Sequence, residues 1–395
     1  MKYRYLLAII TLVLITACNP DEDTFYRESN DLRVKFVPVK PYNERLVPLP
    51  DGSVVVNCKA SDRWDYFLAV IHPDGAVDSL DYCLLSNDPT GANEVEGSVK
   101  TNNQGDIFID NSQYRDANKY RLLKYDKNLN KKFDISGELG KPDYYLVGNV
   151  ALNNGEFVFL TKYVSWDDYS ESYSMFIVSA DGVVGDEIPL TFLSSGHNVS
   201  DICSIGDEIL ITYSFKYSSY HMCILNPHNV SECQTVSLER DFIVRLYDSQ
   251  GRILGYSSGM SNTGFSFFVG SVKRDGSMLL SKPILALSLY CLHDAGDDVL
   301  AVGYRVNYSS DGTLETQYIG FIYNIDINTG AIKDSVIMDY NVKPLFLASD
   351  GKGGYNLFLE RMFKYVNNAN QYNPTLDNIY LYNVSDLHEL QFSEK

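Results

Sequence analysis

A turn followed by a short apolar strand recurs along the whole chain. Residues 51–56 read Asp-Gly-Ser-Val-Val-Val, and residues 155–159 read Gly-Glu-Phe-Val-Phe. The glycines that open the copies are Gly52, Gly105, Gly155, Gly206, Gly251, Gly296 and Gly353. Their spacing of about 50 residues indicates a repeat architecture in which each copy contributes one structural unit.

A polar stretch of variable length follows each apolar strand and leads into a β-hairpin. Residues 66–71 form an apolar strand that turns through Pro73-Asp74-Gly75, and the strand over 318–325 turns through Asp-Ile-Asn-Thr-Gly. Asx residues followed by glycine favour the tight turns that hairpins require. The strands are short, aromatic and β-branched, and no helical periodicity follows the first apolar run. The pattern predicts an all-β chain.

A period near 50 residues with about four strands per unit is typical of a β-propeller. We predict one β-propeller domain over residues 31–395, with seven four-stranded blades favoured and six or eight left open. The last blade is expected to use residues 379–384 and 389–392. A strand near residues 33–37 is expected to pair with this blade and close the ring, which removes exposed sheet edges. Two β-sandwiches are the alternative, but they would not repeat at one spacing.

The N-terminus has the order of a bacterial export signal. Lys2 and Arg4 precede an apolar run over residues 6–15, which is shorter than the roughly 20 residues of a membrane-spanning helix. The run ends in Ile-Thr-Ala-Cys, which resembles a bacterial lipobox ending at Cys18. The resemblance implies that residues 1–17 are a lipoprotein signal peptide and that lipid on Cys18 holds the chain at a membrane. An ordinary secretory signal is the alternative.

Residues 18–30, which begin at the cysteine, are expected to form an acidic tether. Its start, Asn-Pro-Asp-Glu-Asp at 19–23, resembles the export signal of surface-exposed lipoproteins in the Bacteroidota. A flexible, solvated tether would have the same composition. As a whole the chain resembles the uncharacterised β-propeller lipoproteins of gut Bacteroidota. The resemblance implies an outer-membrane lipoprotein, on the cell surface in preference to the periplasmic face.

The charge balance excludes one class of partner. The chain carries 33 basic and 51 acidic residues, a formal net charge of −18, and it has no basic cluster. A surface of this sign repels phosphate backbones, so we predict no binding to nucleic acid. Thirty tyrosines against two tryptophans suit half-buried strands and also recognition surfaces.

Two cysteines are candidates for a disulfide, because export permits oxidation. Cys223 and Cys233 both lie five residues from His228, the centre of an expected hairpin, and would face each other across it. Buried free thiols are the alternative, and the sequence leaves it open. No Cys or His spacing is typical of zinc, and we predict neither a metal nor a cofactor.

The loops between the second and third strands of the blades should gather on one face. They are rich in aromatic residues, contain both tryptophans and carry nearby Asp and Arg side chains, a combination that suits sugar rings or peptides. Packing of the loops against neighbouring blades is the alternative role. The candidate ligand-binding residues are Arg63, Trp64, Tyr114, Arg115, Trp166, Asp167, Tyr169, Tyr217, Arg305, Tyr308, Arg361 and Tyr365.

The sequence assigns no catalytic site. There is no H-E-x-x-H metal site and no α/β domain that could carry a G-x-S-x-G nucleophile turn, and with 51 acidic residues a carboxylate pair cannot be picked out. We therefore predict a binding or scaffold module for a glycan, a peptide or an envelope protein. A polysaccharide hydrolase or lyase that uses loop carboxylates is the alternative, and no catalytic residue is assigned.

Overall fold

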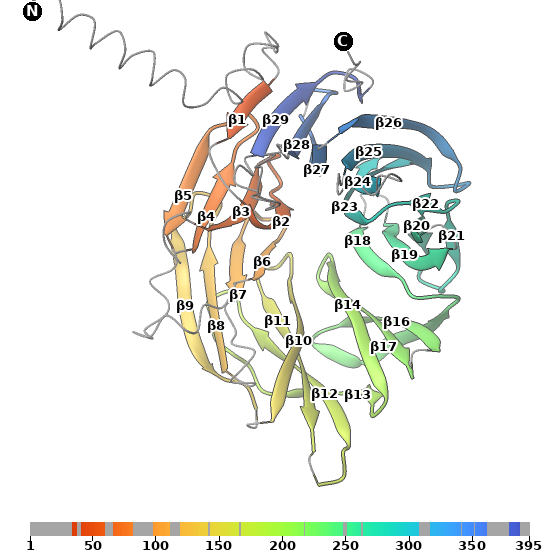
Figure 1. Cartoon of the computed structure of the whole chain (residues 1–395). Helices are drawn as coiled ribbons and strands as arrows, with labels where there is room; N and C mark the ends of the chain where they lie inside the picture. Colours follow the sequence, from red (N-terminus) through yellow and green to blue (C-terminus); the bar gives the residue numbers. More distant parts are fainter. Residues whose placement is uncertain are drawn as a thin grey trace, which may run out of the picture.

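Seven antiparallel sheets form a ring about a common axis (Figure 1). The structure is a computed structural model. It describes residues 34–37, 41–59, 66–81, 98–110, 119–140, 143–165, 167–216, 218–247, 251–261, 264–307, 317–340, 342–350, 352–361 and 379–387. The predicted all-β fold with seven four-stranded blades is confirmed. Within the described residues there is no helix long and apolar enough to cross a membrane.

The first four blades each contain four consecutive strands, counted from the axis outward. Blade 1 holds β2 (Pro41–Pro48), β3 (Val54–Lys59), β4 (Tyr66–Ile71) and β5 (Val77–Asp81), and blade 2 holds β6 (Ser98–Thr101), β7 (Ile107–Asp110), β8 (Lys119–Tyr125) and β9 (Lys131–Glu138). Blade 3 holds β10 (Tyr144–Ala151), β11 (Phe157–Val164), β12 (Glu171–Val178) and β13 (Ile188–Ser194), and blade 4 holds β14 (His197–Ile205), β15 (Glu208–Phe215), β16 (Ser219–Asn226) and β17 (Asn229–Leu238).

The remaining blades depart from this pattern in two places. In blade 5 the outer strand is split, so that β21 and β22 both pair with β20. Blade 5 holds β18 (Ile243–Tyr247), β19 (Ile253–Ser261), β20 (Gly264–Val272), β21 (Met278–Leu280) and β22 (Ile284–Leu285), and blade 6 holds β23 (Ser288–Ala295), β24 (Asp298–Asn307), β25 (Gln317–Asp326) and β26 (Ile332–Tyr340). Blade 7 holds β27 (Val342–Ser349), β28 (Tyr355–Arg361), β29 (Ile379–Val384) and, from the N-terminal side, β1 (Val34–Val37).

The two ends of the described chain meet in blade 7. β1 pairs antiparallel with β29, with Val34 opposite Tyr382 and Val37 opposite Ile379, and it is the outermost strand of the blade. The expected closure of the ring is therefore confirmed. This pairing holds the two ends of the chain in one sheet, so the ring is closed by hydrogen bonds between strands. The expected strand over residues 389–392 lies outside the described residues.

The repeated apolar element forms the second strand of every blade. In blade 3 Gly155 adopts φ +86°, where only glycine is free of strain, and its N–H donates to the carbonyl of Leu152 over 3.1 Å. The chain then enters β11, which is buried because other blades cover both faces of the sheet. Phe157 stacks on Phe108 of blade 2 with ring centroids 5.2 Å apart. The local turn thus starts a strand whose side chains fill the space between blades.

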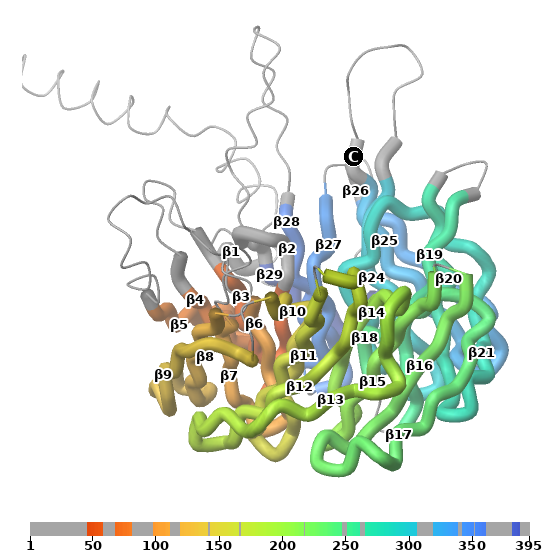
Figure 2. The backbone as a smooth tube through the Cα atoms, turned by 90° about the horizontal axis from the view of Figure 1, so that it is seen from below, coloured from red at the N-terminus to blue at the C-terminus, as the bar shows by residue number. Residues whose placement is uncertain are grey.

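Two faces of the ring follow from the strand order. The connections from first to second and from third to fourth strands lie on one face, the turn face, and those from second to third strands lie on the other, the loop face. Figure 2 shows turns β12–β13 and β16–β17 at the same edge of the molecule. First-to-second connections are short, as between Ile205 and Glu208, whereas second-to-third connections extend up to the segment between Arg361 and Ile379.

Polar contacts join neighbouring blades on the turn face. In blade 2 the Asn102 amide donates to the carbonyl of Leu152 in blade 3, and Asn153 Oδ1 accepts from the N–H of Asn103. The N–H of Asn154 donates to Asp207 Oδ1 in blade 4. Further contacts of this kind are Thr101 with Pro48, Glu156 with His228, Glu208 with Arg274 and Arg252 with Gly296. The described turns are therefore linked from blade 1 to blade 6.

A disulfide joins Cys223 of β16 to Cys233 of β17, with Cα atoms 6.4 Å apart. The expectation that the two residues lie directly opposite each other is wrong. A register shift in β16 after Ile224 places Thr235 opposite Cys223, so the bond crosses the hairpin diagonally. Register in a hairpin depends on the turn and on bulges, and equal distances from its centre do not determine it.

We expect this disulfide to be present in protein purified without reductant. Peptide mapping should then recover Cys223 and Cys233 in one cross-linked species that separates after reduction. Cys203 and Cys291 are free in the structure, and burial raises the pKa of both thiols, that of Cys291 to about 12. A thiolate is the reactive form of cysteine, so these two should resist alkylation in the folded protein and serve as internal controls. Alkylation of Cys233 without prior reduction would contradict the assignment.

Candidate functional site

The structure describes the side chains of three predicted ligand-binding residues. Asp167 and Tyr169 lie together in the β11–β12 loop of blade 3, and Arg305 lies near the end of β24 in blade 6. They share the loop face but belong to separate parts of the ring. Outside the described residues lie Cys18, Arg63, Trp64, Tyr114, Arg115, Trp166, Tyr217, Tyr308 and Tyr365, and for Arg361 only the backbone is described.

The β11–β12 loop holds Tyr169 in an outward position. The N–H of Ser165 donates to the carbonyl of Ser170, and the N–H of Ser170 donates to Asp168 Oδ1 over 3.0 Å. Hydrogen bonds from Ser165 and Ser170 lower the pKa of Asp168 to about 2, so its carboxylate is ionised at neutral pH. Between these contacts Tyr169 has φ +56° and is 73% exposed. A hydrogen-bonded turn thus presents a large aromatic ring to solvent. Its backbone adopts a left-handed conformation that residues other than glycine rarely occupy.

Arg305 follows Tyr304 in β24, and Tyr304 belongs to a buried group of charged and aromatic side chains. Lys343 Nζ lies 3.9 Å from Glu360 Oε2 and 5.3 Å from the centroid of the Tyr304 ring, and Lys343 and Glu360 are almost completely buried. Tyr304 stacks on Tyr290 at 5.5 Å. The Nε atom of Arg305 is itself buried and has no hydrogen-bond partner among the described residues. Blades 6 and 7 therefore bury a Lys–Glu pair beside stacked tyrosines.

A β-bulge recurs in the innermost strand of five successive blades, and the sequence analysis did not detect it. In each of these strands one residue has no residue opposite it in the second strand of the blade. The skipped residues are Val147 in β10, Ser200 in β14, Arg245 in β18, Tyr290 in β23 and Leu345 in β27. A bulge redirects the side chain of the extra residue. Val147, Ser200 and Arg245 are exposed, Tyr290 is half-buried and Leu345 is buried.

Two of the bulged residues, Arg245 and Tyr290, line a cavity of about 620 Å³, the central cavity. Its wall comes from the inner strands β18, β23, β27 and β2, which are neighbours in the ring, and from turns of the turn face. A cavity of this volume suits a small-molecule ligand. Arg245 could have drawn attention in the sequence as a charged residue inside an apolar inner strand, Ile-Val-Arg-Leu-Tyr.

No metal-binding group can be assigned in the part of the chain that the structure describes. No set of three or more His, Cys, Asp or Glu side chains gathers there. His293 borders the central cavity, and burial lowers its pKa, so the imidazole is neutral at pH 7. His221 stacks on Tyr213 with ring centroids 5.3 Å apart.

The closed ring of seven four-stranded sheets defines a β-propeller protein. No protein-family model matches the chain, and no curated protein matches it. The β-propeller domain of the Trilobed protease from Pyrococcus furiosus is similar in structure, with 8% identity, a TM-score of 0.47 and coverage of 91% of this chain and 100% of that chain. Pyrococcus horikoshii acylaminoacyl peptidase has 9% identity and a TM-score of 0.47, with coverage of 88% of this chain and 52% of that chain.

A third similar structure belongs to a different enzyme class. Dihydro-heme d1 dehydrogenase NirN has 10% identity and a TM-score of 0.44, with coverage of 84% of this chain and 66% of that chain. The present chain thus spans about half of the acylaminoacyl peptidase and two thirds of the dehydrogenase. These similarities concern the fold alone, because propellers support many unrelated functions.

Proposed function

We propose that this chain is a lipid-anchored β-propeller of the bacterial cell envelope that binds a glycan, a peptide or a protein partner through its loop face. The lipobox-like segment ending at Cys18 supports the anchor and an outer-membrane location. One observation carries the binding role: the ordered β11–β12 loop presents Tyr169, 73% exposed, at φ +56°. A strained backbone lowers the stability of the fold and is typical of ligand sites. An exposed aromatic ring held there can serve as an anchor for a bound ligand.

The contrast between the two faces supports the same proposal. Polar contacts between successive blades tie down the turn face, and its first-to-second connections are short. The second-to-third connections vary in length and contain both tryptophans of the chain. Recognition residues commonly sit on variable loops that a rigid scaffold positions. The proposal therefore assigns support to the turn face and recognition to the loop face.

The proposal is tested by calorimetry and thermal shift with the purified protein against oligosaccharides, peptidoglycan fragments and peptides. A saturable signal that disappears in Trp64→Ala or Trp166→Ala, while the thermal transition persists, would support recognition by the loop face. A ligand that binds all these variants with unchanged affinity would contradict it. If no member of the panel binds, crosslinking in intact envelopes would test a protein partner, and loop-face variants should then lose the crosslink.

For Tyr169→Gly we expect binding to the loop face to weaken about tenfold or more, the size of effect seen when an aromatic anchor is removed. The free energy of unfolding should stay within about 1 kcal/mol of the parent, since glycine adopts φ +56° without strain and this gain offsets its greater freedom in the unfolded chain. Affinity is measured by titration calorimetry and stability by urea unfolding.

Val183 provides the matched control for this variant. It is 68% exposed in the β12–β13 connection, so it is an exposed apolar residue of the same blade on the turn face. Val183→Ala should leave the affinity unchanged. If both variants lost the same affinity, exposed apolar area in blade 3 would account for binding, and the assignment of binding to the loop face would be contradicted.

A further inference from the structure

The central cavity changes character along its length. Arg245 and Tyr290 lie at the level of the bulges, in the middle of the inner strands. Asp51 and Asp350 belong to turns of the turn face, and Asp294 lies one residue before the end of β23, next to such a turn. Arg245 therefore lines the inner part of the cavity, and three aspartates line its turn-face end, the mouth.

The guanidinium of Arg245 retains hydrogen-bonding capacity beyond its contacts with the described residues. Its Nη2 donates to Tyr256 Oη over 3.0 Å and its Nη1 donates to the carbonyl of Val244 over 3.3 Å. Asp201 Oδ2 lies 3.5 Å from Nη1 and makes no hydrogen bond within the described residues. Arginine carries five N–H donors, so these contacts do not saturate it. The contact with the Tyr256 ring, 5.2 Å from the guanidinium carbon, fixes the orientation of the remaining donors.

Asp201 lies beside Arg245 but does not itself line the central cavity. Burial raises the pKa of Asp201, and the positive charges of Arg245 and Lys100 oppose this rise. Two cations thus act on one carboxyl group that is costly to ionise. Arg245 is the only lysine or arginine among the described residues that line the cavity, although the whole chain is strongly acidic.

Asp51 and Asp350 at the mouth are ionised at neutral pH. For Asp51, burial raises the pKa, but hydrogen bonds from Ser53 outweigh it and the net shift is downward. For Asp350, N–H donors of Lys352 and Gly354 lower the pKa. The mouth therefore carries negative charge held in place by turns.

Apolar side chains separate the two charged regions. Leu46, Leu292, Phe346 and Leu347 all line the central cavity, and they come from three different blades. Apolar lining with polar groups at defined points is the usual composition of a small-molecule site. From the inside outward, the cavity offers a cation, an apolar surface and several anions.

We propose that the central cavity binds an amino acid or a short peptide with apolar side chains, its carboxylate at Arg245 and its ammonium group toward the carboxylates of the mouth. The guanidinium and the carboxylate meet as a charge-assisted pair, which is stronger than a neutral hydrogen bond. The zwitterion matches the polarity of the cavity at both ends. A dianion would be repelled at the mouth, and a simple cation would be repelled by Arg245. This site is separate from the loop face, and the inference stands independently of the proposed function.

The probe for this proposal is L-leucyl-L-leucine, compared by calorimetry with its C-terminal amide and its N-acetyl derivative, using the full chain in detergent. The free dipeptide should bind saturably. The amide, which lacks the carboxylate, should bind at least tenfold more weakly, and the N-acetyl form, which lacks the ammonium group, should also bind more weakly.

Variants assign the two ends of the probe. In Arg245→Met the dipeptide should bind as weakly as its amide does to the parent, and the preference for the free carboxylate should vanish. In Asp350→Asn, which keeps an oxygen acceptor for the turn, the preference for the free ammonium group should shrink. Arg274→Met removes another arginine of blade 5 that does not line the cavity and should change neither preference.

Two results would overturn the proposal: no saturable binding of the dipeptide at millimolar concentration, or a preference for the free carboxylate that persists in Arg245→Met. If Arg245→Met does not fold, Arg245→Lys replaces it, since lysine keeps the charge without the planar donors and should reduce the preference without removing it. An undiminished preference in that variant would equally overturn the proposal. Tyr169→Gly should bind the dipeptide as the parent does, so failure here and failure at the loop face remain distinguishable.

Discussion

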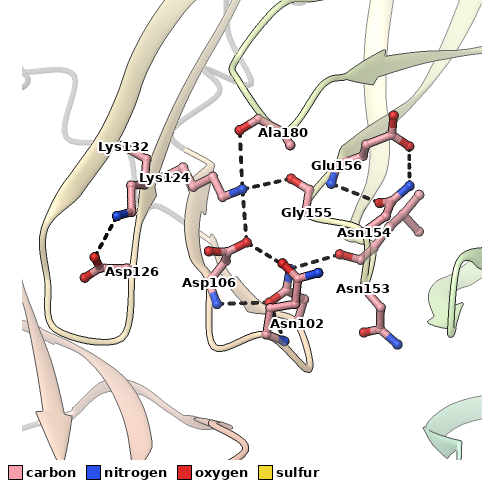
Figure 3. A network of polar contacts seen from close by, with 12 residues as sticks. Asn102, Asp106, Lys124, Asp126, Lys132, Asn153, Asn154, Gly155, Glu156 and Ala180 are labelled. Carbon is pink, nitrogen blue, oxygen red and sulfur yellow. Dashed lines mark hydrogen bonds and ion pairs between the residues drawn. The ribbon is translucent and has the colours of Figure 1, made fainter.

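Replacing Lys124 with methionine is expected to lower the free energy of unfolding by about 3–5 kcal/mol, the range for removal of one partner from a buried ion pair. Lys124 is 5% exposed, and its Nζ lies 3.0 Å from Asp106 Oδ2 and donates to the carbonyl of Gly155 over 3.0 Å (Figure 3). A weaker contact reaches the carbonyl of Ala180 at 3.4 Å. Methionine fills a similar volume but leaves the Asp106 carboxylate and two carbonyls of blade 3 without this donor.

Lys132 is the matched control for this experiment. It pairs with Asp126 at 2.8 Å in the same blade, but its side chain is 49% exposed (Figure 3). Exposed ion pairs contribute about 0–1 kcal/mol, so Lys132→Met should have little effect. The double variant Lys124→Met with Asp106→Asn should recover part of the loss, since it removes the unpaired charge. Urea unfolding measures all three variants, and equal losses in the two lysine variants would contradict a special role for the contact between blades 2 and 3.

Replacing Gly255 with alanine is expected to cost about 1–3 kcal/mol, the range for overpacking in a filled core. A Cβ atom at this position would lie 2.2 Å from the carbonyl oxygen of Ile243 and 2.8 Å from the ring of Phe242, which is fully buried. Gly255 lies opposite Val244, directly beside the bulge that displaces Arg245. The bulged backbone comes too close to β19 for any side chain, and the backbone cannot move without disturbing the bulge.

Gly259, four residues further along β19, provides the comparison. A Cβ atom there would come no closer than 3.6 Å to its nearest neighbour, a carbon of the Phe268 ring. Gly259→Ala should be neutral or stabilising by up to about 1 kcal/mol, because alanine restricts the unfolded chain. Thermal and urea unfolding would measure both variants. Gly255→Ala should also weaken binding of the dipeptide at the central cavity, while Gly259→Ala should not.

Much of the architecture was predictable because the signals for it are local. A glycine at positive φ, as Gly155 at +86°, starts a tight turn, and the apolar run after it must be covered on both faces. Repetition of that unit at one spacing implied a ring, and the number of repeats gave the number of blades. The pairing of β1 with β29 followed because an unclosed ring would leave two exposed edges.

The candidate site was predictable only in part. Tyr169 stood out as an aromatic residue in a polar loop, but its positive φ and its hydrogen-bonded loop are properties of the folded chain. Arg305 was selected for its place in a loop set, whereas the structure places it in β24 with its Nε atom buried and without a hydrogen-bond partner among the described residues. The buried pair Lys343 and Glu360 comes from two strands of blade 7, and the sequence does not show that their charges meet.

By itself, the sequence determined the repeated strands and turns and favoured seven blades, since each depends on neighbouring residues or on a repeat. Only the tertiary structure decided the bulges, the diagonal disulfide and the central cavity. A bulge forms where the twist and packing of neighbouring blades require an extra residue, and no local pattern marks it. Arg245 and Asp350 are far apart in the chain and become two ends of one cavity because the ring closes around it.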